Sequence, residues 1–221
     1  MNDRTAGSQM AEEIREQPTA LARLLGQGRS DVVAAAELVA SRAPRFVSLV
    51  ARGTSDHAAL YAKYLIEIGL GLPCGLASPS TVGLFHAPLR DANDFLVVAV
   101  SQSGETADTL EALRHARRQK ARVLAVCNTN GSQIPRESDA VVYIHAGPEI
   151  GVASTKAFLG MLTANYLVGL ALAQARGTKY RDEIAREYEE LTKIPDAIAT
   201  TLTLMDPVRK LAQEISTAKA I

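Results

Sequence analysis

Apolar residues in the central part of the chain form short runs that are hydrophobic throughout and rich in β-branched side chains. Such runs are typical of strands that are buried on both faces of a parallel sheet. Segments with helical spacing lie between them, at 56–68 and 106–119. This alternation predicts an α/β fold with a doubly wound parallel sheet of about five strands. The expected strands are 46–50, 73–77, 95–100, 123–127 and 140–145.

The two ends of the chain carry apolar residues at helical spacing instead. Near the N-terminus we expect a helix interrupted by Pro18 and a second helix capped by Ser30. We therefore divide the chain into an N-terminal helical arm (1–42), a central sheet domain (43–176) and a C-terminal helical segment (177–221). The end helices are expected at 10–26, 30–41, 153–176, 180–203 and 207–220.

Charge and composition exclude several classes of protein. The 24 basic and 24 acidic side chains cancel, so no global field holds the chain on nucleic acid or on an anionic membrane. A basic cluster at 114–122 is interpreted as the solvated end of a helix. The uncharged segment 157–175 approaches the length of a membrane span, but Thr163 and Asn165 make it polar in places. We expect it to be a helix packed in the core or in an interface, and not a membrane span.

Targeting signals and cysteine chemistry add little. The first residues hold no apolar run of the length that a secretory signal needs, so we expect a cytoplasmic protein. Only two cysteines occur, Cys74 and Cys127, and we expect both in the core. The glycine-rich fingerprints of dinucleotide-binding folds and of nucleotide hydrolases are absent from the sequence. We therefore expect no nucleotide cofactor and no metal.

Small hydroxyl residues follow three of the predicted strands and begin the next helix. Free amides and the helix dipole favour an anion at such positions, and the carboxyl ends of parallel strands meet at one edge of the sheet. The set predicts a site for a phosphorylated, polyhydroxylated small molecule. The alternative for the 101–106 segment is an ordinary capping box in which Ser103 caps the helix. The candidate residues are Thr54 and Ser55, then Ser101, Gln102, Ser103 and Thr106, and finally Val152 and Ser154.

Groups able to act as general acid or base are weak candidates. His57 and His145 lie near the predicted site, but hydrogen-bonded structural histidines are the commoner case. Glu149 and Lys156 flank the third loop, where a salt bridge within the loop is the simpler interpretation. Glu105 at a helix start is explained by the helix dipole. We therefore assign no catalytic residue.

Four segments of the chain form a recognisable pattern. They are EIREQP at 13–18, RGTS at 52–55, SQSGETADT at 101–109 and HAGPEIGVASTKA at 145–157. These segments resemble the sugar isomerase (SIS) domain family, and within it the first SIS domain of the isomerising glutamine:fructose-6-phosphate aminotransferases. SIS-type glucosamine-6-phosphate deaminases and isomerases share much of the pattern. The match covers the chain from about residue 10 to its end, and its motifs are specific.

The resemblance implies a flavodoxin-like sheet that binds a hexose 6-phosphate, either fructose 6-phosphate or glucosamine 6-phosphate. It implies that the phosphate is held by Ser101, Gln102, Ser103 and Thr106. It also implies that the rest of the sugar is lined by Thr54, Ser55, Val152 and Ser154. The activity expected from the family is isomerising amination without a cofactor.

The family pattern is incomplete in this chain. The aminotransferases begin with a glutaminase domain whose nucleophile is an N-terminal cysteine, whereas this chain begins Met1-Asn2-Asp3. Their second SIS domain supplies the catalytic Glu, His and Lys, and it would start at about Ile221. We therefore expect a fragment in which 177–221 is a helical linker toward an absent SIS domain. The apolar 157–175 helix predicts a homodimer or a contact with that domain.

Three other functions stay open from the sequence. An ammonia-using or deaminating SIS enzyme on the same substrates is favoured by the missing glutaminase domain. A sugar-phosphate sensor would bind the ligand without turning it over and relay binding through the terminal helices. A purely structural domain would tolerate alanine at the hydroxyl positions.

Overall fold

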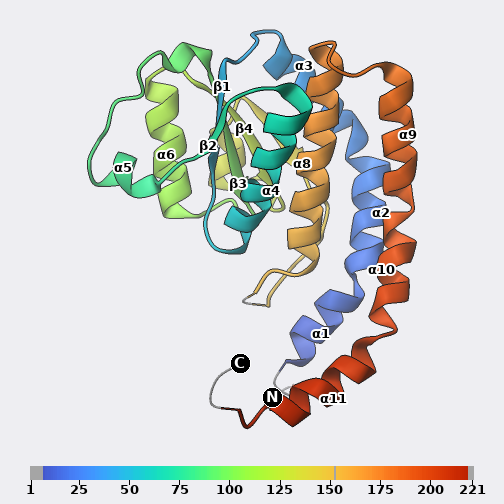
Figure 1. The fold of residues 1–221 in the computed structure, drawn as a ribbon. Coiled ribbons are helices and arrows are strands. Elements are labelled where there is room, and N and C mark those ends of the chain that lie inside the picture. Colours follow the sequence, from blue (N-terminus) through green and yellow to red (C-terminus); the bar gives the residue numbers. More distant parts are fainter. Residues whose placement is uncertain (1–6, 152, 219–221) are drawn as a thin grey trace.

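The computed structural model describes residues 7–151 and 153–218 of the chain (Figure 1). Its centre is one parallel sheet with the strand order β2-β1-β3-β4-β5. This order confirms the predicted doubly wound α/β fold with five strands. Because the order reverses between β1 and β3, the carboxyl ends of these two strands mark the switch point of the fold. The strands are β1 (Phe46–Val50), β2 (Cys74–Leu76), β3 (Phe95–Ser101), β4 (Arg122–Cys127) and β5 (Ala140–Tyr143).

The strands form where the sequence is hydrophobic on both faces. In β3, residues 96–101 are all buried, and Val97 pairs with Ser48 of β1 and with Val123 of β4. Successive side chains alternate between two cores, with Val98 on one side of the sheet and Ala99 on the other. A strand in the middle of a sheet with helices on both faces therefore reads as one continuous apolar run.

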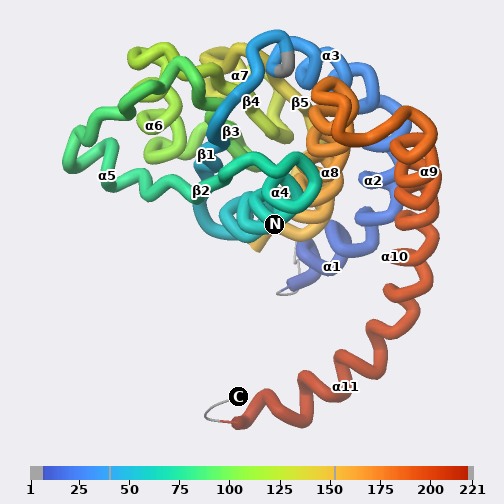
Figure 2. The backbone as a smooth tube through the Cα atoms, turned by 45° about the horizontal axis from the view of Figure 1, so that its top comes forward, coloured from blue at the N-terminus to red at the C-terminus, as the bar shows by residue number. Residues whose placement is uncertain are grey.

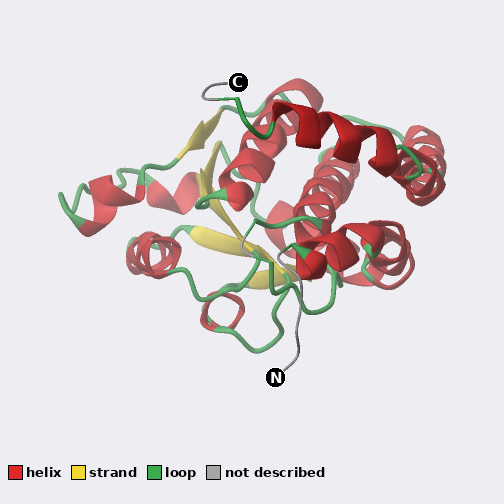
Figure 3. Ribbon diagram, turned by 90° about the horizontal axis from the view of Figure 1, so that it is seen from below, coloured by secondary structure: helices red, strands yellow, loops and turns green. Residues whose placement is uncertain are grey.

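Helices cover the two faces unequally, as Figure 3 shows. One face carries a thick layer of α3 (Arg29–Ala40), α4 (Thr54–Leu70) and α8 (Lys156–Ala175), with α2 (Gln17–Gln27) packed behind α8. The other face carries the thinner layer of α6 (Ala107–Arg118) and α7 (Gln133–Arg136), with α5 (Pro79–Gly83) packed on α6. A single turn of 3-10 helix, Ala92–Asp94, leads into β3.

The apolar helix α8 lies in the core. By length and composition it resembles a membrane span, with a mean hydropathy of 1.4, but 56% of that window is buried inside the protein. Core helices of soluble proteins share these properties. It contacts α2, α3, α4 and α9 (Arg181–Thr192), which confirms a buried helix.

The two ends of the chain run side by side and then separate. α1 (Ser8–Arg15) and α2 meet α10 (Ile194–Leu202), whereas α11 (Met205–Ile215) leaves the body of the molecule (Figure 2). Leu204, Val208 and Leu211 of this last segment are exposed. Pro195, which interrupts the helical spacing expected over 180–203, stands in the first turn of α10, so this stretch forms the two helices α9 and α10.

The helix caps and the basic cluster complete the comparison with the sequence. The expected Ser30 cap is wrong, because α3 begins one residue earlier with Gly28 as its cap. A Cβ at Gly28 would lie 2.7 Å from Leu24 Cδ1, so close packing of α2 selects glycine there. In the basic cluster, Arg114 pairs with Glu137 and Arg118 with Glu111 on the surface.

Candidate functional site

The loops after β1 and β3 are neighbours at the switch point of the sheet. Arg52 follows β1, and its Nη2 lies 2.9 Å from the Asp108 Oδ2 in the first turn of α6. Both side chains are more than half exposed, so this ion pair adds little stability. It shows, however, that the two loops face each other across the edge where open α/β sheets bind ligands.

The 101–106 loop is held by its own hydroxyl groups. Ser101 is buried, and its Oγ accepts the amide of Gly104 at 3.0 Å and lies 3.3 Å from the Thr106 Oγ1. The Oγ of Ser103 accepts the amide of Glu105 at 3.2 Å. The loop also bonds the segment after β4, because the Gln102 carbonyl accepts the amide of Asn128 at 3.3 Å.

Gly104 is required in this loop for two reasons. Its φ is +70°, in the left-handed region, and a Cβ there would lie 2.0 Å from the Ser132 Oγ. The same Cβ would lie 2.8 Å from the Cys127 Sγ. The backbone at Gly104 thus rests directly on β4 and on the segment that leads into α7, which also accounts for the amide of Ile134 donating to the Gly104 carbonyl at 2.9 Å.

The N-termini of α4 and α6 carry free amides. Thr106, and not Ser103, is the cap residue of α6, so the capping-box interpretation is wrong. Neither Thr106 nor Gly53, the cap residue of α4, makes a side-chain capping bond in the described part of the chain. Two helix dipoles with uncapped first turns therefore point their positive ends at the switch point, which favours an anion there.

The third hydroxyl-bearing loop is different, because a side chain already fills its helix start. Oxygen Oε1 of Glu149 accepts the amides of Thr155 at 2.7 Å and of Ala157 at 3.3 Å, and Oε2 accepts the Ser154 hydroxyl at 2.7 Å. The carboxylate of Glu149 thus accepts one amide of the first turn of α8, that of Ala157, and the amide of the cap residue Thr155. The anion position of this helix is occupied from within the loop.

Lys156 pairs outside the loop, which corrects the expected salt bridge with Glu149. Its side chain is only 2% exposed, and its Nζ forms an ion pair with Glu16, at the junction of α1 and α2. A buried ammonium needs such a partner, because taking its charge out of water is costly. Glu105 likewise has a structural role, since its carboxylate accepts the amide of Gln133 at the start of α7.

The two histidines do not form an acid–base pair at the site. His57 is exposed in the first turn of α4. His145 faces α3, where its Nε2 lies 3.7 Å from the Asp31 Oδ2 without a hydrogen bond. A φ of +51° at His145 turns the chain at the end of β5. The described residues therefore place no evident proton-transfer group beside the 101–106 loop.

The structure places the predicted binding residues in different surroundings. The hydroxyl groups of Ser101 and Thr106 lie close together. Gln102 and Ser103, which stand between them in the sequence, are half-buried. The Ser154 hydroxyl donates to Glu149. Thr54 and Ser55 begin α4 on the neighbouring strand end, with Ser55 buried. Val152 lies outside the described residues. The role of Glu149 as a helix cap was missed, although a glutamate six residues before a threonine at a helix start is a readable signal.

Both thiols are buried and unpaired, as expected. Burial raises the pKa of the Cys74 thiol to about 12 and also raises the pKa of Cys127. Cys127 lies under Gly104 at the end of β4, so a neutral thiol forms part of the floor of the 101–106 loop. It is a packing residue and not a nucleophile.

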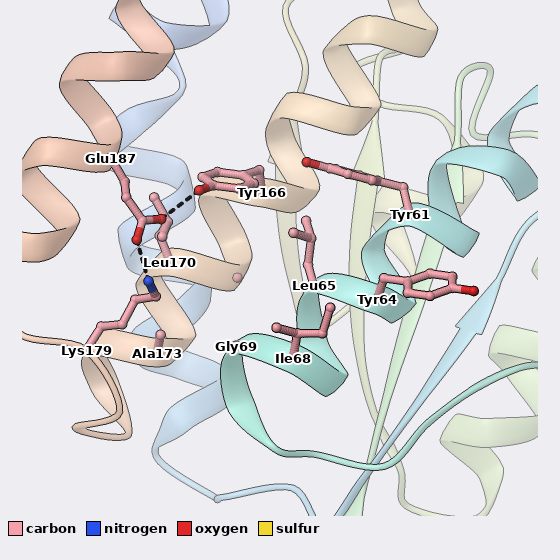
Figure 4. Close-up of a pocket in the computed structure, with 11 residues that line it drawn as sticks. Tyr61, Tyr64, Leu65, Ile68, Gly69, Tyr166, Leu170, Ala173, Lys179 and Glu187 are labelled. Atoms are coloured by element: carbon pink, nitrogen blue, oxygen red, sulfur yellow. Dashed lines mark hydrogen bonds and ion pairs between the residues drawn. The ribbon is translucent and has the colours of Figure 1, made fainter.

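A separate apolar groove of about 360 Å³ lies between α4, α8 and α9 (Figure 4). Its wall holds Tyr61, Tyr64 and Ile68, and a polar group closes one end. There the Tyr166 hydroxyl donates to Glu187, which also pairs with Lys179. Burial raises the pKa of Tyr166, and the Glu187 carboxylate adds to that shift. The groove lacks hydroxyl-rich loops and is distinct from the switch point.

Comparison with known families gives a match to the SIS domain over residues 42–171. The chain is 54% identical over 219 residues to a glutamine–fructose-6-phosphate aminotransferase (isomerising) of Mycolicibacterium paratuberculosis, covering 96% of this chain and 34% of that protein. It is 53% identical over 214 residues to the enzyme of the same name from Streptomyces coelicolor, covering 94% and 34%. The chain thus spans about a third of the length of these curated relatives.

Solved structures give the same picture. The C-terminal domain of glucosamine-fructose-6-phosphate aminotransferase from Francisella tularensis superimposes with a TM-score of 0.86 at 33% identity, covering 95% of this chain and 59% of that one. A glucosamine-6-phosphate deaminase from Thermotoga maritima superimposes with a TM-score of 0.66 at 19% identity, covering 86% and 54%. At that identity the second likeness concerns the fold alone.

Proposed function

Because this chain belongs to the SIS domain family, we propose that it is the sugar-phosphate-binding part of an isomerising glutamine:fructose-6-phosphate aminotransferase. The observation that carries the proposal is the 101–106 loop, which sets hydroxyl groups beside the uncapped start of α6 at the switch point. The relatives that match over 96% of the chain bear this enzyme's name, and the activity of the whole enzyme is part of the proposal.

The phosphate binds at the start of α6. Ser101, Gln102, Ser103 and Thr106 surround it, and the dipole of α6 offsets its charge without a basic side chain. The sugar extends toward Thr54 and Ser55 on one side and toward Ser154 on the other. Because Glu149 already occupies the start of α8, that helix contributes hydroxyl contacts and not the phosphate site.

This arrangement serves the chemistry by positioning the substrate. In the proposed reaction, the ring of fructose 6-phosphate opens and ammonia condenses with C2 as water leaves. A proton then moves from C1 to C2 to give glucosamine 6-phosphate. The residues of this chain hold the phosphate as a remote anchor, and that binding fixes the orientation of C1 and C2. The acid and base groups come from a second SIS domain, in keeping with the absence of evident candidates among the described residues near the loop.

We further propose the domain division 1–42, 43–176 and 177–221, with pairing through a second copy or a second SIS domain. Tyr64 and Ile68 are exposed in the apolar groove between α4, α8 and α9, which supports the proposal that a second copy or a second SIS domain covers this groove. A monomer by light scattering at high concentration would contradict pairing between copies.

Thermal-shift titration tests the binding proposal. Fructose 6-phosphate and glucosamine 6-phosphate at a hundred times their Kd are expected to raise the Tm by roughly 5–10 °C, because the ligand binds only the folded chain. Inorganic phosphate should give less and unphosphorylated fructose nothing. Ser103→Ala is expected to weaken sugar-phosphate binding about tenfold. Ser41→Ala, on an exposed helix end away from the site, is the matched control.

Two outcomes separate the proposal from its rivals. Ammonia release from glucosamine 6-phosphate by the chain alone would favour a deaminase. Binding of the sugar phosphates that is unchanged by Ser103→Ala would contradict the assignment of the 101–106 loop.

A further inference from the structure

The N-terminal arm is hydrogen-bonded to the third hydroxyl-bearing loop, residues 145–155, although the two are more than a hundred residues apart in sequence (Figure 1). Arg23 of α2 holds the beginning of the loop. Its Nε donates to the carbonyl of His145 and its Nη2 to that of Ala146, both at 3.1 Å. The arm lies before residue 42, where the family match begins.

Glu13 of α1 holds the middle of the loop. Its carboxylate accepts the amide of Ile150 at 2.5 Å, and the amide of Gly151 at 3.0 Å to Oε2 and 3.2 Å to Oε1. Glu13 is only 1% exposed, so these charge-assisted bonds replace the water that the carboxylate gives up. A Cβ at residue 151 would lie 2.5 Å from Oε2, so glycine is the residue that lets the carboxylate approach this closely.

The end of the loop is held by the ion pair between Glu16 and the buried Lys156. Charged side chains of α1, of α2 and of the junction between them therefore contact the loop at its beginning, in its middle and just past its end. The 101–106 loop, in contrast, makes none of its described hydrogen bonds with the arm. The arm thus acts selectively on one side of the proposed site.

We infer that Glu13 is a positioning residue for the sugar portion of the ligand. The inference rests on the proposed function. Glu13 fixes Gly151, three positions before Ser154, whose hydroxyl donates to Glu149 of the same loop. Loosening Gly151 frees the loop that faces the sugar, and binding must then pay the cost of ordering it. The 101–106 loop makes no described hydrogen bond with the arm. It is linked to the beginning of the 145–155 loop through Asn128, whose side chain bonds Ala146 and Gly147 and whose amide donates to the Gln102 carbonyl.

The test compares Glu13→Gln with Glu12→Gln. Glutamine keeps one acceptor oxygen but presents an NH₂ group to a backbone amide, so one of the two loop contacts is lost. Glu12 is the exposed neighbour on the same helix and makes no described side-chain contact, which makes it a matched control. Glu13→Gln is expected to weaken fructose 6-phosphate binding about tenfold while inorganic phosphate binding changes less than about twofold. Glu12→Gln should change neither.

The outcomes distinguish this inference from the proposed function. Wild-type chain that binds neither ligand contradicts the proposed function itself. Wild-type chain that binds fructose 6-phosphate with an affinity unchanged by Glu13→Gln overturns the inference, as does an equal loss of both ligands. Amide hydrogen exchange of the ligand-free chain gives a readout that needs no ligand. In Glu13→Gln, exchange should be faster than in the wild type at the amides of Ile150 and Gly151 and unchanged at 101–106. Unchanged exchange at Gly151 also overturns the inference. If Glu13→Gln does not fold, Glu13→Asp keeps the charge and shortens the reach.

Discussion

The two loops that flank the proposed ligand differ in what holds them. The 101–106 loop is held by the Ser101 hydroxyl and by the segment that follows the neighbouring strand β4, where Gly104 and Glu105 accept the amides of Ile134 and Gln133. The 145–155 loop is held by its own Glu149 and also by Glu13 and Arg23 of the arm. The proposed phosphate loop thus relies on the next strand along the chain, whereas the neighbouring wall of the same site relies on a segment more than a hundred residues away.

The strongest way to break this comparison is Gly104→Ala. The substitution combines a left-handed backbone with a Cβ that collides with Ser132 and Cys127, so we expect a loss of about 3 kcal/mol in the free energy of unfolding. Gly131→Ala, at φ +73° with open space around the Cβ, should cost only about 1 kcal/mol. Urea denaturation measures both. Equal losses would mean that the contact with β4 does not hold the loop.

A smaller effect is expected from Glu16→Gln, which tests how far the arm stabilises the 145–155 loop. The variant leaves the Lys156 ammonium buried without its ionic partner. Because Glu16 itself is 52% exposed, we expect a loss of about 1–2 kcal/mol, less than for a fully buried pair. The exposed pair of Lys193 and Glu190 offers the control, and Glu190→Gln should change the unfolding free energy by less than about 0.5 kcal/mol. A loss no larger than the control would show that the arm contributes nothing through this pair.

The smallest expected effect is the pH dependence that the Arg114–Glu137 pair gives to the free energy of unfolding. The hydrogen bond from Arg114 lowers the pKa of Glu137, which tethers α6 to the end of α7. A carboxylate with a lowered pKa stabilises the folded chain above its unfolded pKa, and the contribution is lost as the pH falls through the folded pKa. Glu137→Gln is therefore expected to lower stability near neutral pH and to differ less from wild type as the pH falls below about 4.5. Chemical denaturation over this pH range measures the difference, and a constant gap would contradict the assignment.

The sequence predicts those parts of the molecule that are specified locally. The central strands β3 and β4 are predictable because each is an apolar run buried on both faces, and the hydroxyl groups at 101–106 are predictable because they follow such a run. The edge strands β2 and β5 are less buried, and their short apolar runs between helical segments predict them. The short helix α7 is missed, since a four-residue helix containing Pro135 has no period to detect. Its contact with Gly104 is nevertheless part of the site's floor.

Two kinds of contact account for the remaining errors. The caps of α3 and α8 are local, since Gly28 packs on Leu24 four residues earlier and Glu149 reaches Thr155 six residues later. The partner of Lys156 could not be chosen between Glu149 and Glu16 without knowing that the arm returns to this loop. Which acidic residue serves which amide is decided by tertiary packing.

The hold of Glu13 on Ile150 also sets an order of events in time. The two residues are 137 positions apart, and a ribosome adding about 5–20 residues per second needs roughly ten seconds to cover that interval. During synthesis the Glu13 carboxylate therefore stays without its loop partners while the strands that follow the arm in sequence are made. The wall of the site that depends on the arm can acquire these contacts only once residue 151 has been made, later than the synthesis of the 101–106 loop.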